Sequence, residues 1–199
     1  MIYESHFWKD DLIKQANNLR AKAKQRRWTE ASSARLEQTI MLGYYSIRKL
    51  VESQKLSNSV INQKITISAY PWKGKPVTRL NWHKIDELFD LENPQTLTKD
   101  LLFFCHQFVH SYVFWEFFSD DPRLLEGVFV SSDKERHHYL YSLPIIHIIG
   151  LFEQIGNDYP ANFELIYNHQ KMDYEMKDCE VKSKDKSLRV KRIWLTPSS

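Results

Sequence analysis

The feature that most constrains the fold is a run of apolar residues at helical spacing between residues 30 and 54. Apolar side chains three and four positions apart line one stripe of a helix. The stripe consists of Leu36, Ile40, Gly43, Tyr44, Ile47, Leu50 and Val51. A side-chain oxygen of Thr29, Ser32 or Ser33 is expected to cap its start, because it can accept from free first-turn amides. Gly43 predicts a close crossing with another segment, since it has no side chain to hold that segment away.

A similar spacing over residues 4–27 predicts a helix that precedes this one. Its less polar stripe consists of Trp8, Leu12, Gln15, Ala16, Leu19 and Ala23. The two predicted helices would join near residues 27–31. They therefore predict a helical hairpin over residues 1–56.

Residues 57–199 mix strand-like alternation with short helical stretches. Strands are predicted near 64–70, 111–118, 125–131, 137–143, 163–167, 172–176 and 188–195. Helices are predicted at 83–90, at 98–110 after Thr96 or Thr98, and at 144–155 after Ser142. Apolar residues surround the last helix on nearly all sides, so it is expected to be buried. The pattern predicts one α+β domain over 1–199, with a mixed middle and a largely antiparallel sheet.

Composition and termini exclude several classes of protein. Hydrophobic residues make up 42% of the chain and aromatic residues 14%, which excludes wholesale disorder. Cys105 and Cys179 alone form no disulfide framework and no Cys-rich zinc module. The first residues lack the pattern of a secretory signal, and no apolar run approaches the roughly 20 residues of a membrane helix. We therefore expect a cytoplasmic protein without membrane contact.

Charge is segregated along the chain, although the net charge is only +3. Residues 1–80 carry 15 Lys and Arg against 6 Asp and Glu, whereas residues 81–180 carry 7 against 18. Residues 181–199 are basic again, with 6 against 1. Such asymmetry indicates contact with nucleic acid or another charged partner. The alternative is intramolecular: a basic helical part lies beside an acidic body and is partly neutralised by it.

The densest basic segment spans residues 20–27, and Trp28 follows it directly. Cationic side chains on one surface can bind phosphates, and an aromatic ring can stack on a base. A helix through residue 27 would place Arg20, Lys24 and Arg27 close to one stripe. The predicted binding residues are Arg20, Lys22, Lys24, Arg26, Arg27, Trp28 and Arg35. The alternative is a solvated helix face, because charge runs are common on amphipathic helices.

Two histidines four residues apart, His106 and His110, lie within the predicted helix 98–110. That spacing places both imidazoles on one helix face, where they could hold zinc or another divalent metal. A third ligand would come from His147, Glu153 or Cys105. The alternative is two structural histidines that donate to ordinary acceptors. A second pair, His137 and His138, supplies a candidate general base.

Aromatic residues are concentrated between residues 103 and 118. The predicted strand 112–118 carries apolar groups on both faces. It is therefore expected to be buried on both sides or to form an interface, including one between copies of the chain.

These observations lead to one function hypothesis and two alternatives. The leading hypothesis is a non-enzymatic, cofactor-free binding protein whose basic N-terminal helices contact nucleic acid or an acidic protein partner. The first alternative is a small metal- or histidine-dependent hydrolase or nuclease that uses His106 and His110. The second is a structural or oligomerising subunit. The chain has no GxxxxGK[ST], GxGxxG, GxSxG or CxxC motif, which disfavours nucleotide-dependent and α/β-hydrolase chemistry.

Overall fold

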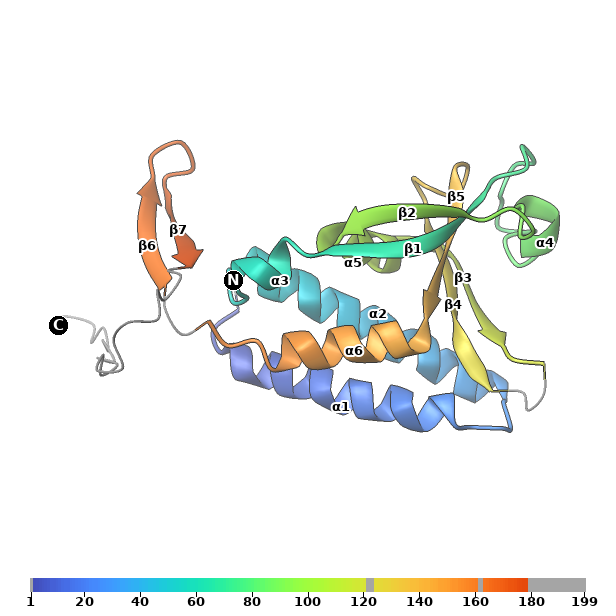
Figure 1. Ribbon diagram of the computed structural model, residues 1–199, viewed down its shortest axis with the longest axis horizontal. Coiled ribbons are helices and arrows are strands. Elements are labelled where there is room, and N and C mark those ends of the chain that lie inside the picture. Colours follow the sequence, from blue (N-terminus) through green and yellow to red (C-terminus); the bar gives the residue numbers. More distant parts are fainter. Residues whose placement is uncertain (1, 121–123, 161–162, 179–199) are drawn as a thin grey trace. The chain divides into compact units, whose positions relative to one another are not determined.

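The computed structural model describes residues 2–120, 124–160 and 163–178 (Figure 1). The elements are α1 (Ser5–Ala23), α2 (Glu30–Glu52), α3 (Asn58–Ile61), β1 (Lys64–Pro71), α4 (Ile85–Leu88), β2 (Gln95–Asp100), α5 (Leu101–Val109), β3 (Ser111–Phe118), β4 (Leu125–Ser132), β5 (Tyr139–Pro144), α6 (Ile145–Gly156), β6 (Phe163–Asn168) and β7 (Asp173–Asp178). Helices combine with an antiparallel sheet, so the predicted α+β class is confirmed. The chain divides into two compact units, Met1–Pro160 and Ala161–Ser199. The prediction of a single domain stays a prediction.

The N-terminal hairpin consists of α1 and α2, which pack against each other and against α6 (Figure 1). α1 buries Leu12, Ala16 and Leu19 completely, because these residues recur at helical spacing on its inner face. Thr29 caps α2, as predicted, and its side chain accepts from the Ser32 amide at 3.3 Å. The apolar stripe of α2 is buried from Leu36 to Leu50, and Val51 is partly buried.

The sheet of the first unit has the strand order β2–β1–β5–β4–β3, and every neighbouring pair is antiparallel. Its register aligns Ser68 of β1 with Thr96 on one side and Ser142 on the other. Phe129 of β4 lies between Trp115 of β3 and Ser142 of β5. β2 and β3 form the two edges of this sheet.

Opposite faces of the sheet belong to two separate hydrophobic clusters. Successive strand residues point to opposite faces, so Tyr141 joins the helices in the larger cluster while Leu140 faces away from them. The larger cluster contains buried residues of α1, α2, α5 and α6. The smaller one is built on the excursion between β1 and β2, with Val77, Leu88 and Phe89. α4 and its flanking loops therefore cover part of the face that the helices leave open.

The predicted helix 98–110 is wrong at its start. Residues 95–100 form β2, which pairs with β1 and places Thr66 opposite Thr98. The cap of α5 is Asp100, whose side chain accepts from the Phe103 amide at 2.7 Å. Pairing with β1, in which Thr66 and Thr98 are 32 positions apart, overrides the local helical signal, because a ladder of hydrogen bonds satisfies these backbone groups.

Two other predicted boundaries and the predicted burial and capping of α6 also differ from the structure. α1 ends at Ala23 rather than at residue 27. His137 and His138 lie in the turn before β5, not in the strand. α6 is buried on one side, but Ile146 is 62% exposed, and no side chain caps its start. The predicted strand at 188–195 lies outside the described residues.

Lys9 is buried near the start of α1, with 1% of its surface exposed. Its ammonium donates to the Lys55 carbonyl at 2.9 Å and to the Asp158 carbonyl, and it lies 4.2 Å from the centre of the Tyr159 ring. Burial lowers the pKa of this amine, and nearby Asp158 partly opposes that shift. The lysine thus connects α1 to the segments that follow α2 and α6.

The described part of the second unit is a two-stranded hairpin. β6 and β7 pair antiparallel, and the Tyr167 and Tyr174 rings stand edge to face at 5.2 Å. Leu165 and Ile166 are both exposed. A hairpin with exposed apolar side chains has little core of its own.

None of the helices that the structure describes is long and apolar enough to cross a bilayer.

Gly43 supplies a direct test of the helix packing. A β-carbon built there would lie 2.1 Å from the tip of the Phe152 ring, so Gly43→Ala overpacks the contact between α2 and α6. We expect a loss of about 1–3 kcal/mol in the free energy of unfolding, measured by urea denaturation. Gly150→Ala is the matched control, because its β-carbon meets nothing within 4 Å. That variant should gain about 0.5–1 kcal/mol from helix propensity. Equal effects of the two variants would contradict this packing.

Candidate functional site

The loop between α1 and α2 is fixed by a network around Gln25 and Trp28. The Gln25 side chain donates to the Arg27 carbonyl at 2.6 Å and to the Ser32 hydroxyl at 3.0 Å. The Trp28 indole donates to the Gln25 carbonyl at 2.9 Å, and its ring meets Phe118 of β3 edge to face at 5.1 Å. These contacts hold the loop against the end of β3.

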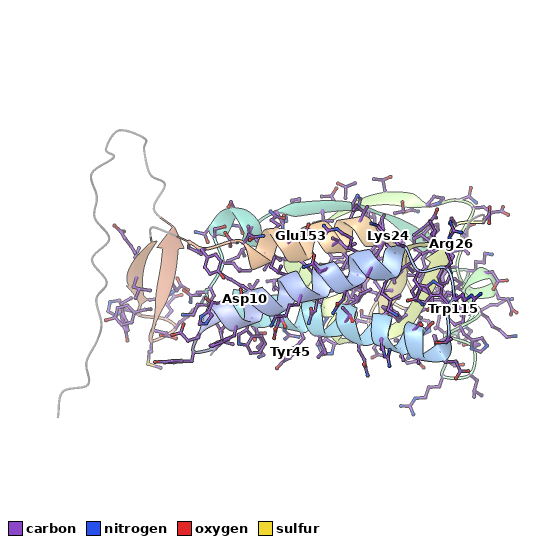
Figure 2. All side chains as sticks on the ribbon, turned by 90° about the horizontal axis from the view of Figure 1, so that it is seen from below. Asp10, Lys24, Arg26, Tyr45, Trp115 and Glu153 are labelled. Atoms are coloured by element: carbon purple, nitrogen blue, oxygen red, sulfur yellow. The ribbon has the colours of Figure 1, made fainter. Side chains whose placement is uncertain are left out.

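Because α1 ends at Ala23, the predicted basic stripe is divided between a helix and this loop. Arg20 and Lys22 lie on α1, whereas Arg26 and Arg27 lie in the loop, and Arg35 lies on α2. Figure 2 shows Lys24 and Arg26 at the C-terminal end of α1, with Asp10 toward its other end. The hairpin therefore brings the predicted residues to one end of the helix pair.

Two of the predicted cations have partners within the protein. Arg20 forms an ion pair of 2.6 Å with Glu153 on α6, which lies beside α1 (Figure 2). Lys22 donates to Gln25 at 3.1 Å and lies 5.4 Å from the centre of the Trp28 ring. Only the contact between Arg20 and Glu153 is of the kind that the intramolecular alternative describes, because Gln25 and Trp28 are uncharged.

The other four predicted cations form what we call the tip cluster: Lys24, Arg26, Arg27 and Arg35. All four are exposed. Their side chains form no ion pair and no hydrogen bond with any described residue. Glu30 and Glu37 lie in the same part of the chain and are also exposed, but neither pairs with the cluster.

Other cations on the same helices do have carboxylate partners. Lys14 lies 2.9 Å from Asp11, and Arg48 and Lys49 lie 2.7 and 2.8 Å from Glu52. Unpaired positive charge on the hairpin is therefore concentrated at its tip. Such a concentration attracts anions more strongly than the same charges dispersed among carboxylates.

Trp28 was predicted to stack on a base, and the structure places it partly inside the protein. Its ring packs against the larger hydrophobic cluster, and its indole N–H is already bonded within the loop. Trp28 thus positions the loop that carries Arg26 and Arg27. Its stacking role stays a prediction.

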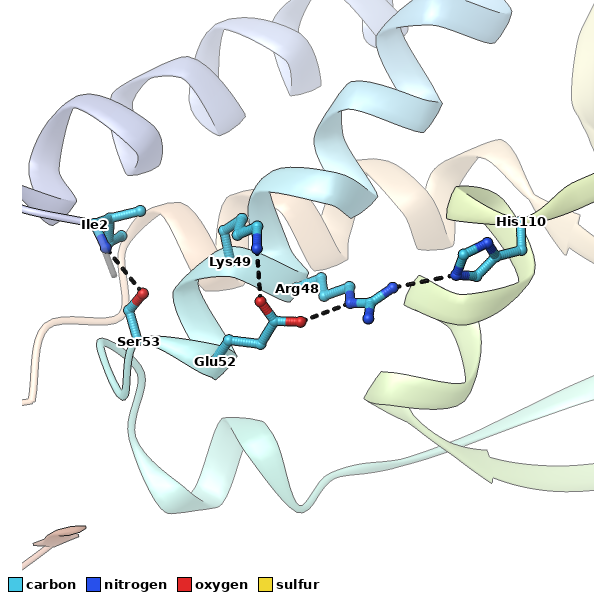
Figure 3. Close-up of polar contacts among 6 residues, drawn as sticks. All are labelled: Ile2, Arg48, Lys49, Glu52, Ser53 and His110. Atoms are coloured by element: carbon cyan, nitrogen blue, oxygen red, sulfur yellow. Dashed lines mark hydrogen bonds and ion pairs between the residues drawn. The ribbon is translucent and has the colours of Figure 1, made fainter. Parts of the chain in front are cut away.

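The predicted histidine pair is brought together at the end of α5, where His106 lies in the helix and His110 follows its last residue. The His106 and His110 ring centres are 4.5 Å apart. Figure 3 shows the Arg48 guanidinium between Glu52 and His110, with Nη1 3.4 Å from the His110 Nε2. Burial lowers the pKa of His106, and His110 and Arg48 lower it further. Neutral imidazole suits a metal ion, but the adjacent guanidinium carries a charge that repels one.

In the described part of the chain, none of the three candidate third ligands forms a hydrogen bond or an ion pair with the two histidines, although Cys105 lies on the same helix. Cys105 is buried, and burial raises the pKa of its thiol to about 12. Glu153 is engaged with Arg20, and His147 is exposed on α6. Within residues 2–120, 124–160 and 163–178, no three His, Cys, Asp or Glu side chains are grouped to hold a metal. The metal-dependent hydrolase stays a prediction.

His137, a general-base candidate, has a structural contact. Its Nε2 accepts from the Val77 amide at 3.1 Å, and its ring lies 5.1 Å from that of Trp72. It therefore links the turn before β5 to the excursion after β1.

The aromatic strand β3 is partly covered. Trp115 is exposed, and its ring stands 5.9 Å from Trp82 of the excursion. Val113 is fully buried, and Phe114 packs against the larger cluster. The predicted burial on both faces therefore holds for part of the strand only, because Trp115 is exposed. An interface between copies of the chain stays a prediction.

Sequence reasoning missed a groove between α6 and β1, of about 300 Å³. Its lining includes Tyr44 of α2, Gln63 and Gly150 of α6. These positions are far apart in sequence and belong to no motif, so no sequence signal indicated that they meet.

The chain matches no protein-family model, no curated protein and no solved structure.

The lowered pKa of His106 predicts a pH dependence of stability. The folded protein disfavours the imidazolium form of His106, whose ordinary pKa is 6.5. The free energy of unfolding is therefore retained above pH 6.5, and it falls as the pH drops through the lower pKa of the folded state. Urea denaturation between pH 7.5 and 5 should show a smaller loss for His106→Gln than for the wild type. Parallel profiles, or an NMR titration midpoint of His106 at or above 6.5, would rule out this account.

Proposed function

We propose that the protein binds nucleic acid, and that the tip cluster contacts its phosphates. One observation carries the proposal: four exposed cations at the tip lack a carboxylate partner among the described residues, whereas Lys14, Arg20, Arg48 and Lys49 have one. Phosphate contacts provide most of the affinity of non-specific nucleic-acid binding, because they release condensed counterions.

The side-chain types at the tip suit this role. Three of the four cluster residues are arginines, whose planar guanidinium can donate two parallel hydrogen bonds to one phosphate. Gln25 and Trp28 fix the loop backbone, so less conformational entropy is lost when the loop binds.

The composition of the tip favours nucleic acid over an acidic protein partner. The exposed residues between 24 and 35 are charged, polar or alanine, and none is a large apolar residue. Protein interfaces usually contain buried aromatic or aliphatic anchors, whereas phosphate contacts do not require them.

The proposal predicts that charge removal weakens binding only at the tip. The tip variant combines Arg26→Gln, Arg27→Gln and Arg35→Gln. The control combines Lys14→Gln, Lys49→Gln and Lys84→Gln, which removes the same charge from cations that have carboxylate partners. Fluorescence anisotropy with labelled DNA and RNA oligonucleotides is measured across a salt series.

Each lost phosphate contact should lower the slope of log affinity against log salt by about one. We therefore expect the tip variant to lose about three from the slope and the control to stay close to the wild type. Equal losses in both variants, or no wild-type binding at low salt, would refute the proposal. Tighter binding to an acidic peptide than to an oligonucleotide of equal charge would replace nucleic acid with an acidic protein partner.

A further inference from the structure

The groove between α6 and β1 has mainly apolar walls. They include Ile65, Ile67, Leu143, Ile146 and Leu151. Its volume of about 300 Å³ lies at the lower end of the range for small-molecule sites, about 300–1,000 Å³. None of the described residues that line it is Lys, Arg, Asp or Glu.

Two polar groups at the groove lack partners in the described chain. Tyr44 is 1% exposed and stacks on Phe108 at 4.1 Å, yet its hydroxyl forms no hydrogen bond with any described residue. The Gln63 Nε2 atom is buried and also lacks a partner. Buried polar groups are normally hydrogen-bonded, and each exception calls for an explanation. Burial raises the pKa of the Tyr44 phenol, so its proton stays available for donation.

Gly150 is a third, independent feature of the same groove. It lies inside α6, where glycine is less favourable than alanine. A β-carbon there would meet nothing within 4 Å, and its backbone is not left-handed, so neither packing nor conformation requires glycine. By contrast, Gly43 is needed because Phe152 occupies the space beside it. The missing side chain at Gly150 keeps the wall of the groove open.

We propose that this groove binds a small neutral amphiphile, with an aliphatic body along the apolar walls and an oxygen that accepts hydrogen bonds from Tyr44 and Gln63. No Lys or Arg among the described residues lines the groove, and His147 is the one imidazole in that lining, so a carboxylate would have no permanent counter-charge there. This favours an alcohol, ketone or ester over a carboxylate. The site is independent of the tip cluster, so either proposal can fail alone.

Calorimetric titration with n-octanol tests this site, and octanoate serves as the charged analogue. Wild-type protein should bind octanol saturably at one site per chain and octanoate at least tenfold more weakly. Gly150→Leu should abolish octanol binding by filling the groove. Ala34→Leu is the control, because it adds a leucine at an exposed helix position outside the groove, and it should leave the affinity within about twofold. Tyr44→Phe and Gln63→Leu should each weaken binding by about three- to tenfold.

Three outcomes would overturn this inference. The first is a wild-type protein that shows no saturable octanol binding up to the solubility limit. The second is octanoate binding as tight as that of octanol, or octanol binding unchanged in Gly150→Leu. The third is a shift in oligomeric state of Gly150→Leu in size-exclusion chromatography, which would make the groove an interface between copies. Circular dichroism confirms that each variant is folded before titration.

Discussion

The close approach of α2 and α6 at Gly43 is the contact on which the rest of the first unit depends. The Phe152 ring occupies the space that a side chain at position 43 would fill. The next residue, Tyr44, stacks on Phe108 of α5 and meets Phe152 edge to face. One turn of α2 thus contacts two other helices, and together they cover one face of the sheet. A larger residue at Gly43 would separate these helices and open the larger cluster to water.

The same arrangement explains where the charges lie. Packing of α1 beside α6 brings Arg20 to Glu153, which neutralises one cation of the basic segment across 133 positions of sequence. The α1–α2 loop extends past the end of α1, and the four cations of the tip cluster have no carboxylate partner among the described residues. The structure therefore partly neutralises the segregated charge internally and leaves the remainder at the hairpin tip. This remainder supports the proposal of phosphate binding.

Much of the fold could be predicted from the sequence, because its strongest signals are local. The apolar stripe of α2 and the Thr29 cap each depend on residues within a few turns, and both are confirmed. The prediction failed at β2, where pairing between Thr66 and Thr98 determines the conformation, and this pairing is not visible in a window of ten residues. It also failed at the end of α1, because the predicted helix was extended through the basic residues 24–27 although the apolar stripe stops at Ala23, where the helix ends.

The sequence predicted which basic residues belong to the candidate site, but not which of them form ion pairs with carboxylates. The basic residues were found as a run, yet only the tertiary structure shows that Arg20 is neutralised and that Arg27 is not. The groove could not be predicted at all, because Tyr44, Gln63 and Gly150 come from three distant segments. Sequence spacing reports neighbours on one element, whereas a groove is made by neighbours on different elements.

The central claim is that unneutralised positive charge is concentrated at the hairpin tip, and NMR relaxation with charged cosolutes tests it most directly. An anionic and a neutral paramagnetic chelate of similar size are compared at each backbone amide at low salt. The account predicts that the anionic chelate relaxes the amides of residues 24–35 more strongly than the neutral one, since the local potential attracts it. Amides near Lys14, which is paired with Asp11, should respond almost equally to both chelates. Equal or weaker relaxation by the anionic chelate at residues 24–35 would contradict the account.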